Sequence, residues 1–359
     1  MPSLSRHAEV DSTQVIGLPP DDTKPRHGAP PRKRRRWRRT AFITVAVLAL
    51  LGGSGALAGG LYLRSVESSV ERLDAFEEIP QEDRPEKVSQ DAKNLLILGS
   101  DTRDPNSEGG SRSDTIILAH LAGGRTSAQL VSIPRDTWVH VPRSSNGQHG
   151  NREAKINAAY AWGGVPLMVQ TVEKFTGVRI DNVVIIDFAG FKEIIDALGG
   201  VEIDVEESFT SRHSLNADGR REFTKGRQTM DGAAALDYAR ERYAFADGDF
   251  ARIRHQQQVI KAILDKAVSG GVLANPSRLN AFVKATADSV AVDQTLSILD
   301  LAMELRHLRS GNLTFVTSPT KGTGMVGSES VVFPDTAKAE TFYDAVRRDA
   351  VPEILKIAG

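Results

Sequence analysis

The sequence predicts an α/β protein in which helices cover both faces of a sheet. From residue 94 onward, short apolar runs of strand length alternate with longer segments of helical spacing. Apolar residues make up 40% of the chain and charged residues 25%, as is ordinary for a globular protein. The 359 residues leave room for one large domain or two ordinary ones, and no internal repeat or second folded domain is visible. The chain has no cysteine, which excludes a disulfide framework, a thiolate metal site and a cysteine nucleophile.

Turn residues separate the expected elements. Pro134 ends a strand because it cannot donate to a ladder, and Gly199-Gly200 end a helix. The strands are expected at residues 94–98, 114–121, 129–133, 182–187, 201–205, 313–317 and 330–333. The helices are expected at residues 155–175 (interrupted at Gly163-Gly164), 188–198, 231–242, 250–268, 276–290, 296–308 and 337–348.

The first 63 residues differ from the rest in charge and hydropathy. Residues 1–40 carry ten Lys/Arg against four Asp/Glu, so the remainder has a net charge near −7 and no basic excess to attract nucleic acid. Residues 1–39 lack apolar periodicity and are predicted to be a disordered tail that ends in a basic run. Residues 40–63 carry no charge, and at about 1.5 Å per residue they can cross a hydrocarbon core of about 30 Å.

This pattern predicts a single-pass protein of the cell membrane. A basic cluster before the span keeps the N-terminus in the cytoplasm and places everything after it outside. A tail that binds nucleic acid is one alternative, and a signal peptide cleaved after Ala56-Leu57-Ala58 is another. Continuation of the apolar span through Leu61-Tyr62-Leu63 favours the uncleaved anchor. Residues 64–92 are charged and contain two prolines, which predicts an extracytoplasmic stalk before a folded domain over residues 93–350.

Carboxylates and arginines lie at the ends of predicted strands. Asp101 follows one strand and Asp114 opens the next, and ligands bind at the carboxyl ends of strands in open α/β sheets. Two such carboxylates, each beside an arginine, could hold a divalent cation together with substrate phosphates. The alternative is that both are turn or capping residues. Arg135 is expected at the rim of the sheet, or else in a surface salt bridge with Asp136.

Four arginines fall within fifteen residues of the segment 238–258, namely Arg240, Arg242, Arg252 and Arg254. Guanidinium groups keep their charge and match phosphate oxygens bidentately, so their convergence indicates a polyanion. The alternative is a solvated charged face. Asn157, at the start of the helix over 155–175, is either a polar pocket group or an ordinary first-turn residue.

Other known site motifs are absent or out of place. Residues 322–327 fit GxGxxG, but a dinucleotide site needs that motif to open a helix, and here a strand-like segment follows. The sequence contains no HExxH, GxSxG or P-loop pattern, and its eight histidines lack metal-ligand spacing.

The motifs together resemble the LytR-CpsA-Psr family of bacterial cell-wall assembly proteins. They follow one another in a fixed order: GSDTR, RSDT, SIPRDTWV, KINAAYAWGG, TVEKFTGVRIDNVVIIDFAGFKEIIDALGGV, YARERY and GDFARIRHQQQ. Residues 320–332 also resemble the family's C-terminal hairpin. The resemblance implies an α-β-α sandwich with a central mixed sheet and a hydrophobic pocket for lipid. It also implies a phosphotransferase of cell-wall assembly that attaches a polyprenyl-diphosphate-linked glycopolymer to the muramic acid of peptidoglycan and releases polyprenyl phosphate, with membrane lipid as a further partner.

The resemblance also assigns roles to residues. Asp101 and Asp114 match the family's Mg²⁺-associated aspartates, with Mn²⁺ as the alternative metal. The family's phosphate-binding arginines match Arg103, Arg135, Arg240, Arg242 and Arg252. Phosphoryl transfer depends mainly on positioning and charge neutralisation, so Asp114 and all of these arginines except Arg103, which is expected only to bind substrate, are expected to carry catalysis. The general base stays open. The walls of the lipid pocket are expected from Val184, Ile186, Phe188, Phe191 and Ile195.

Helical geometry ranks the side chains of the segment 250–268. Ile253, Ile260, Leu264 and Ala267 form one apolar stripe, and Arg252 and Gln256 lie together along its margin, where both can face substrate. Arg254 points about 100° to the other side. His255, where the family usually has Arg, is expected opposite the stripe in solvent.

Three other functions remain as alternatives to the transferase. The chain could be a membrane-bound transcriptional regulator or attenuator, a polyprenyl-diphosphate hydrolase, or a lipid-binding module without turnover. A cytoplasmic location of the arginine cluster would favour the regulator. Enzymatic turnover that is lost when Asp114 or Arg242 is replaced by alanine would exclude the lipid-binding module.

Overall fold

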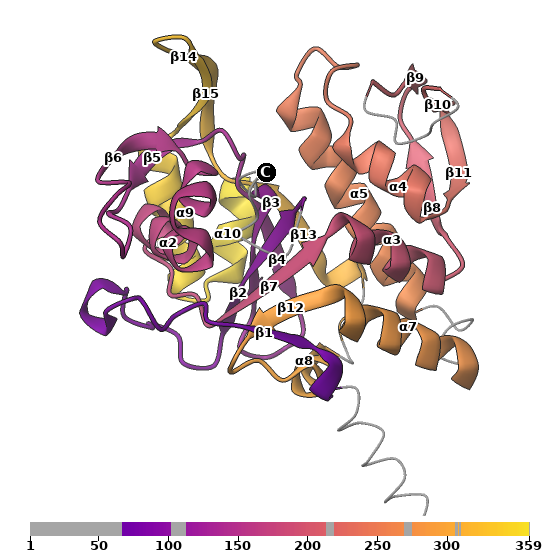
Figure 1. Ribbon diagram of the computed structural model, residues 1–359, viewed down its shortest axis with the longest axis horizontal. Helices are drawn as coiled ribbons and strands as arrows, with labels where there is room; N and C mark the ends of the chain where they lie inside the picture. Colours follow the sequence, from indigo (N-terminus) through magenta and orange to yellow (C-terminus); the bar gives the residue numbers. More distant parts are fainter. Residues whose placement is uncertain are drawn as a thin grey trace, which may run out of the picture. The chain divides into compact units, whose positions relative to one another are not determined.

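Seven strands form the central sheet of the computed structural model (Figure 1). The structure describes residues 67–101, 113–212, 219–268, 275–305, 308 and 310–358. The chain divides into two compact units, Met1–Ala58 and Gly59–Gly359, and the described residues all belong to the second. The predicted tail, the predicted membrane span over 40–63 and Arg103 lie outside the described residues. No helix within the described ranges combines the length and hydropathy needed to cross a membrane.

The central sheet is mixed, as predicted, with the order β1-β12-β7-β2-β3-β4-β13. Adjacent strands run parallel in the pairs β1/β12, β7/β2 and β4/β13, and antiparallel in the other three pairs. The strands are β1 (Glu71–Leu73), β2 (Lys93–Ser100), β3 (Ser113–Leu121), β4 (Ala128–Ser132), β7 (Asn182–Asp187), β12 (Val290–Asp293) and β13 (Leu313–Thr317). Runs such as the fully buried β4 match a sheet that is covered on both faces.

Helices cover both faces of this sheet (Figure 1). One face packs against α2 (Ala158–Thr176), α9 (Thr336–Arg347) and α10 (Val351–Ala358). The other packs against α3 (Phe188–Ala197), α5 (Asp249–Val268), α7 (Pro276–Ser289) and α8 (Ile298–Leu305). Helix α4 (Gly232–Arg240) packs on α3 and α5 in a separate apolar cluster.

Small hairpins and 3₁₀ turns complete the described part of the chain. The two-stranded pairs are β5 (Trp138–Val141) with β6 (Arg152–Lys155), β8 (Val201–Val205) with β11 (Gly226–Met230), β9 (Phe209–Thr210) with β10 (Glu222–Phe223), and β14 (Thr320–Val326) with β15 (Glu329–Pro334). The 3₁₀ turns are η1 (Gln81–Asp83) and η2 (Ser310–Asn312). The β14–β15 pair is the predicted C-terminal hairpin, and it contains the GxGxxG segment as a strand and turn.

Helix α2 breaks where the sequence predicted an interruption. Gly163 and Gly164 have non-helical dihedral angles, and Gly164 has φ of 60° and ψ of −149°. That conformation is available to glycine at little steric cost because it has no Cβ. Pro166 then starts the second part of the helix, where a missing N–H group is tolerated.

The predicted stalk is wrong over its described part, residues 67–92. Strand β1 pairs in parallel with β12 and forms an edge of the central sheet. Val70, Ala75, Ile79 and Ala92 are buried. These apolar side chains are spaced among charges and prolines, so the composition of the segment hid the fact that it packs on the domain.

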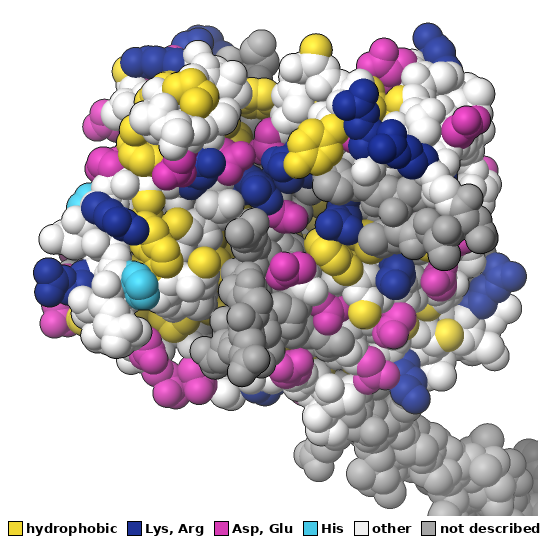
Figure 2. Space-filling view, turned by 45° about the horizontal axis from the view of Figure 1, so that its top comes forward, with side chains coloured by type: hydrophobic (Ala, Val, Ile, Leu, Met, Phe, Trp, Pro, Cys, Tyr) yellow, Lys and Arg dark blue, Asp and Glu magenta, His cyan; other side chains and the backbone are white. Residues whose placement is uncertain are grey.

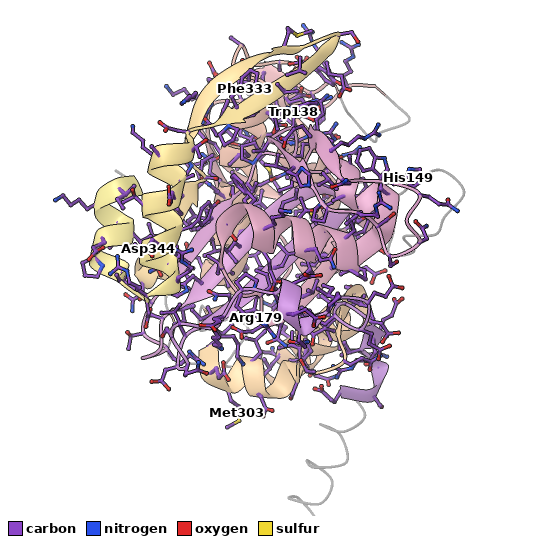
Figure 3. All side chains as sticks on the ribbon, turned by 90° about the vertical axis from the view of Figure 1, so that its left-hand side faces the viewer. Trp138, His149, Arg179, Met303, Phe333 and Asp344 are labelled. Carbon is purple, nitrogen blue, oxygen red and sulfur yellow. The ribbon has the colours of Figure 1, made fainter. Side chains whose placement is uncertain are left out.

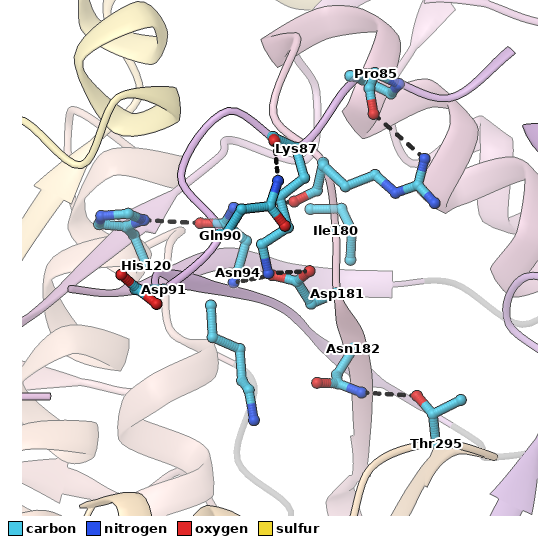
Figure 4. Close-up of polar contacts among 12 residues, drawn as sticks. Pro85, Lys87, Gln90, Asp91, Asn94, His120, Ile180, Asp181, Asn182 and Thr295 are labelled. Atoms are coloured by element: carbon cyan, nitrogen blue, oxygen red, sulfur yellow. Dashed lines mark hydrogen bonds and ion pairs between the residues drawn. The ribbon is translucent and has the colours of Figure 1, made fainter. Parts of the chain in front are cut away.

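A polar network ties the amino end of β2 to its neighbours (Figure 4). The Asn94 N–H group donates to Asp181, which also pairs with Lys87 at 2.7 Å. The Asn94 side-chain oxygen lies 2.8 Å from His120 Nδ1, and Asp349 lies 2.9 Å from the Nε2 atom. Burial lowers the pKa of His120. This end of the sheet is therefore fixed by internal contacts, and the carboxyl end of β2 lies at the other edge.

Replacing Glu173 with Ala should lower the free energy of unfolding by about 3–5 kcal/mol, because it leaves a buried guanidinium without its counter-charge. Glu173 on α2 accepts hydrogen bonds from Arg84 and from the Ile180 N–H group, and the two charged side chains are only 5% and 2% exposed. Urea unfolding of the purified protein measures the loss. Asp344→Ala, which breaks exposed ion pairs on α9, is the control and should have a much smaller effect. Equal losses in the two variants would contradict the assignment.

Candidate active site

Four strand ends meet at one edge of the sheet and form a cavity of about 350 Å³. The register pairs Gly99 of β2 with Thr115 of β3 and Ser100 with Asp187 of β7, so both neighbours of β2 reach the edge where it ends. A Cβ on Gly99 would lie 2.8 Å from the Thr115 Cβ, so only glycine allows this approach. Figure 2 shows basic, acidic and hydrophobic side chains close together around the hollow on this face.

The inner wall of the cavity is apolar. It is formed by Ile97, Leu98, Ile117, Ile186, Phe188, Phe191, Leu236, Ala239 and Ile260. Ile186, Phe188 and Phe191 were predicted as wall residues. Val184 and Ile195 were predicted as well, but they pack in the core. Val184 lies one side-chain repeat further from the strand end than Ile186, and Ile195 lies one helical turn beyond Phe191.

Arginines line the rim of the same cavity. Arg135 comes from the loop after β4, Arg240 and Arg242 from the end of α4 and the following loop, and Arg252 from the first turns of α5. Segments far apart in sequence therefore bring four of the predicted arginines together. The guanidinium of Arg240 lies 4.3 Å from the centre of the Phe188 ring, which places this charge directly against the apolar wall.

Two of these arginines form ion pairs with carboxylates. In each pair the Nε–H group of the arginine makes no hydrogen bond to a described residue. Arg135 forms an ion pair with Asp114, and Arg252, which is 4% exposed, pairs with Asp249. Burial lowers the pKa of Arg252 and raises the pKa of Asp249. Burial also lowers the pKa of Arg135, but Asp114, Asp136 and Asp249 more than offset it, so the pKa is raised overall. Within the described part of the chain, the Nε atoms of Arg135 and Arg252 are buried without a hydrogen-bond partner.

A buried carboxylate shapes the loop that carries Arg242. Glu241 is fully buried and accepts hydrogen bonds from the N–H groups of Arg242 (2.9 Å), Tyr243 (2.7 Å) and Ala244 (3.0 Å), as well as from Arg212. Burial would raise the pKa of Glu241, but these backbone donors outweigh it and the pKa is lowered. The ionised side chain therefore holds the loop between α4 and α5 in place. Sequence reasoning missed Glu241 because it lies between two arginines and looked like part of a charged face.

Helix α5 presents its side chains largely as predicted. Arg252 and Gln256 line the cavity, whereas Arg254 is 46% exposed outside it and pairs with Asp247 at 2.5 Å. The prediction for His255 is wrong, since it is only 7% exposed and its ring stacks on Phe209 at 5.6 Å. The prediction considered only the aliphatic stripe of α5. Aromatic residues from neighbouring segments cover the opposite side of the helix, where His255 lies.

The two predicted metal ligands lie in the same cavity. Asp101 follows β2 and Asp114 opens β3. Asp187 also lines the cavity, but its carboxylate accepts a hydrogen bond from the Gly190 N–H group at 2.6 Å and caps α3. No group of three or more His, Asp or Glu residues in the described ranges could hold a metal unaided. Two carboxylates that need substrate oxygens to complete the coordination are a donor set that fits Mg²⁺.

Asn157 is the one predicted polar site residue in the described ranges that does not line this cavity. It lies in a neighbouring cavity, which shares Arg135 with the first. Its backbone N–H group donates to the Arg135 carbonyl at 3.2 Å. Asn157 therefore supports the loop of Arg135 through its backbone, and its side chain faces a different space.

Replacing Glu241 with Gln should make the amides of Arg242, Tyr243 and Ala244 exchange with solvent roughly 10- to 100-fold faster, because hydrogen bonds to a charged group stabilise by about 1.5–3 kcal/mol. Hydrogen–deuterium exchange with mass spectrometry measures the rates. Glu202→Gln, at an exposed position of β8, is the matched control and should leave them unchanged. Unaltered exchange in Glu241→Gln would show that the loop does not depend on this carboxylate.

Replacing His255 with Phe should flatten the acid side of the pH–stability profile. Burial lowers the pKa of His255 from 6.5 to about 4, so the unfolded chain takes up the proton first as the pH falls. The contribution of the neutral ring to stability is full above pH 6.5 and is lost progressively toward pH 4, by up to about 3 kcal/mol.

Urea unfolding at several pH values in this window measures the slope. The same substitution at exposed His149 should leave the slope as it is in the wild type. A wild-type slope in His255→Phe would contradict the role of this ring.

Comparison with known proteins agrees with the motifs and the fold. The sequence model of the LytR_cpsA_psr family matches residues 61–348. The cell wall biosynthesis protein LcpA of Corynebacterium glutamicum is 29% identical over 350 residues, which cover 87% of this chain and 65% of LcpA, so this chain spans just under two thirds of that relative.

Two further relatives come from bacilli. The polyisoprenyl-teichoic acid–peptidoglycan teichoic acid transferase TagU of Bacillus cereus is 35% identical over 240 residues, with 65% of this chain and 72% of TagU covered. The crystal structure of Bacillus subtilis TagV superposes with a TM-score of 0.59 at 28% identity, covering 74% of this chain and 98% of TagV. Since the family's sequence model spans most of the chain and a solved relative shares its fold, the chain belongs to the LytR-CpsA-Psr family.

Proposed function

We propose that the chain transfers a glycopolymer from a polyprenyl diphosphate carrier to the muramic acid of peptidoglycan and releases polyprenyl phosphate. One observation carries this proposal: buried guanidinium N–H groups without hydrogen-bond partners lie beside an apolar wall in a single cavity. Unpaired buried donors are costly, so they favour an anionic ligand. A diphosphate attached to a hydrocarbon chain fits this cavity, because the diphosphate can bind the arginines and the hydrocarbon can pack on the apolar wall. The names of TagU and its relatives describe the same type of transfer.

The apolar wall is proposed to hold the isoprenoid next to the diphosphate. Its side chains come from β2, β3, β7, α3, α4 and α5, so several rigid elements fix its shape. Burial of apolar surface contributes about 25 cal/mol per Å², which makes even a few isoprene units a sizeable source of affinity. Arg240 lies against Phe188 at the boundary, where the hydrocarbon ends and the phosphate begins.

The reaction is a substitution at the phosphorus that carries the glycopolymer. A muramic acid hydroxyl oxygen forms a new P–O bond, the P–O bond to polyprenyl phosphate breaks, and the hydroxyl proton passes to a base. Among the described residues that line the cavity, Asp101 and Asp114 are the carboxylates not used as helix caps, and both are candidates to take the proton. A metal bound to them would lower their basicity, so the general base stays open. A bound Mg²⁺ or Mn²⁺ on these carboxylates would neutralise charge on the leaving phosphate. The arginines bind the diphosphate and stabilise the charge that develops on its oxygens.

The lipid carrier places the reaction at a membrane. The uncharged residues 40–63 are proposed to anchor the chain, with the basic tail in the cytoplasm and the cavity outside. This orientation brings the arginines to the side of the membrane on which peptidoglycan is assembled.

Arg242→Ala and Arg252→Ala should each slow the release of polyprenyl phosphate by roughly 100-fold or more, because each removes a charged donor to the developing phosphate. The full-length protein in detergent is incubated with a polyprenyl-diphosphate sugar, Mg²⁺ and peptidoglycan, and mass spectrometry quantifies the released lipid. Arg254→Ala is the matched control, since this exposed arginine lies outside the cavity on the same helix. If both variants release polyprenyl phosphate as fast as the wild type, the proposed site is wrong. If the wild type releases it equally fast with and without peptidoglycan, the protein is a hydrolase.

A further inference from the structure

A second cavity of about 440 Å³ adjoins the first at Arg135. Its walls come from the β5–β6 hairpin, the start of α2 and the first residue of β15, and they include Trp138, Arg152, Lys155, Asn157, Trp162 and Glu329. Figure 3 views the molecule from this side and places Trp138 beneath the β14–β15 hairpin, near Phe333. None of these groups has a role in the proposed binding of the lipid diphosphate.

The walls of this cavity are fixed to the loop of Arg135. The Ile156 N–H group donates to the Thr137 carbonyl at 2.8 Å, and the Asn157 N–H group donates to the Arg135 carbonyl at 3.2 Å. Trp138 pairs with Lys155 across the β5–β6 hairpin. The distance between the two cavities is therefore set by backbone contacts, and a ligand in the second cavity lies next to the arginine that lines the first.

The side chains of the second cavity suit a sugar. Trp138 and Trp162 are half-buried, and indole rings offer a flat apolar face together with one hydrogen-bond donor. Arg152 lies over the ring of Trp162 at 4.4 Å and His149 stacks against the same ring at 6.1 Å, so these side chains hold the indole in place and cover part of its faces. Asn157 occupies the N-cap position of α2, but its side chain makes no capping hydrogen bond, so its amide is not used by the helix. A pyranose ring has apolar C–H faces for the indoles and hydroxyls or amides for the polar groups.

The charge of the second cavity is balanced. Its basic residues Arg135, Arg152 and Lys155 are matched by Asp136, Glu153 and Glu329. Lys155 lies 3.9 Å from Asp136 and 3.6 Å from Glu329, so it is largely neutralised. The cavity therefore has no excess of positive charge to attract a polyanionic chain, whereas an amino-sugar strand can use its hydrogen-bond donors and acceptors.

We propose that this second cavity binds the acceptor, an N-acetylated amino-sugar strand, and presents its hydroxyl to the phosphorus beside Arg135. This inference rests on the proposed transfer. The first cavity is divided between hydrocarbon and diphosphate, so the incoming hydroxyl must arrive through a neighbouring space, and the second cavity shares a wall residue with it. The glycan of the donor is the other sugar source, and the charge balance disfavours a phosphate-rich donor polymer there.

The test compares Trp162→Ala and Asn157→Ala with Asn280→Ala, an exposed asparagine on α7. Asn157→Ala removes only a side-chain amide, so it keeps the test valid if Trp162→Ala fails to fold. With the full-length protein, the KM for a soluble tetrasaccharide of alternating N-acetylglucosamine and N-acetylmuramic acid should rise about fivefold to tenfold in Asn157→Ala. It should rise about tenfold or more in Trp162→Ala. The KM for the lipid-linked donor should stay unchanged in both, and Asn280→Ala should match the wild type.

Each other outcome overturns one specific statement. A raised donor KM with an unchanged acceptor KM would place the donor glycan in this cavity, and unchanged values for both would remove its role as a subsite. If the wild type transfers no glycopolymer, the proposed function is wrong. The inference about the second cavity is then tested only by measuring whether the tetrasaccharide binds. Tryptophan fluorescence titrated with the same tetrasaccharide must then report binding in the wild type that is weakened in Asn157→Ala, and no binding in the wild type overturns the inference.

Discussion

The site depends on the burial of guanidinium groups beside hydrocarbon. Arg252 is 4% exposed, and Arg240 lies on a phenylalanine ring, so water cannot solvate these charges fully. Isolated buried charges are prohibitively costly, and Asp114 and Asp249 offset the cost for Arg135 and Arg252. The pairing is incomplete, since the Nε atoms of both arginines have no hydrogen-bond partner in the described structure, although Asp136 lies 3.6 Å from that of Arg135. The guanidinium groups are already buried in the folded protein. An anionic ligand that forms the missing hydrogen bonds therefore binds without a further desolvation penalty for these groups.

The sheet register is what brings the charged groups together. Strand β2 lies between β7, which runs parallel to it, and β3, which runs antiparallel, so the end of β2, the end of β7 and the start of β3 share one edge. Close approach at Gly99 and the register shift after it turn the chain toward Asp101. A β-bulge of this kind re-aims side chains at the rim of a sheet. The arginines of α4 and α5 then reach the same edge from the helical layer, where Glu241 fixes the intervening loop.

The sequence predicted the parts of this arrangement that have a local pattern. Buried strands such as β7, the break at Gly163-Gly164 and the shared orientation of Arg252 and Gln256 follow from periodicity and backbone sterics. The arginine cluster over residues 240–254 indicated a polyanion, and the family resemblance identified that polyanion as phosphate and added Arg103 and Arg135. Two wrong predictions, the stalk and the solvent-exposed His255, concern features that depend on tertiary contacts. Strand β1 has three residues and joins the sheet only through β12. His255 is buried because aromatic side chains distant in sequence cover it. Asp249 lies inside the arginine cluster, yet its burial has no sequence pattern.

Arg135 connects the two cavities, and its contacts explain how the reactants could be ordered. Its side chain pairs with Asp114 in the first cavity, while its carbonyl accepts from the backbone of Asn157 at the wall of the second. A diphosphate that draws the guanidinium from Asp114 would leave that carboxylate available to accept a hydrogen bond from the incoming hydroxyl. The backbone contact would not change, so the second cavity would keep its position during this exchange. In the proposed transfer, binding of the donor would thus prepare the acceptor side by a local change of ion-pair partner.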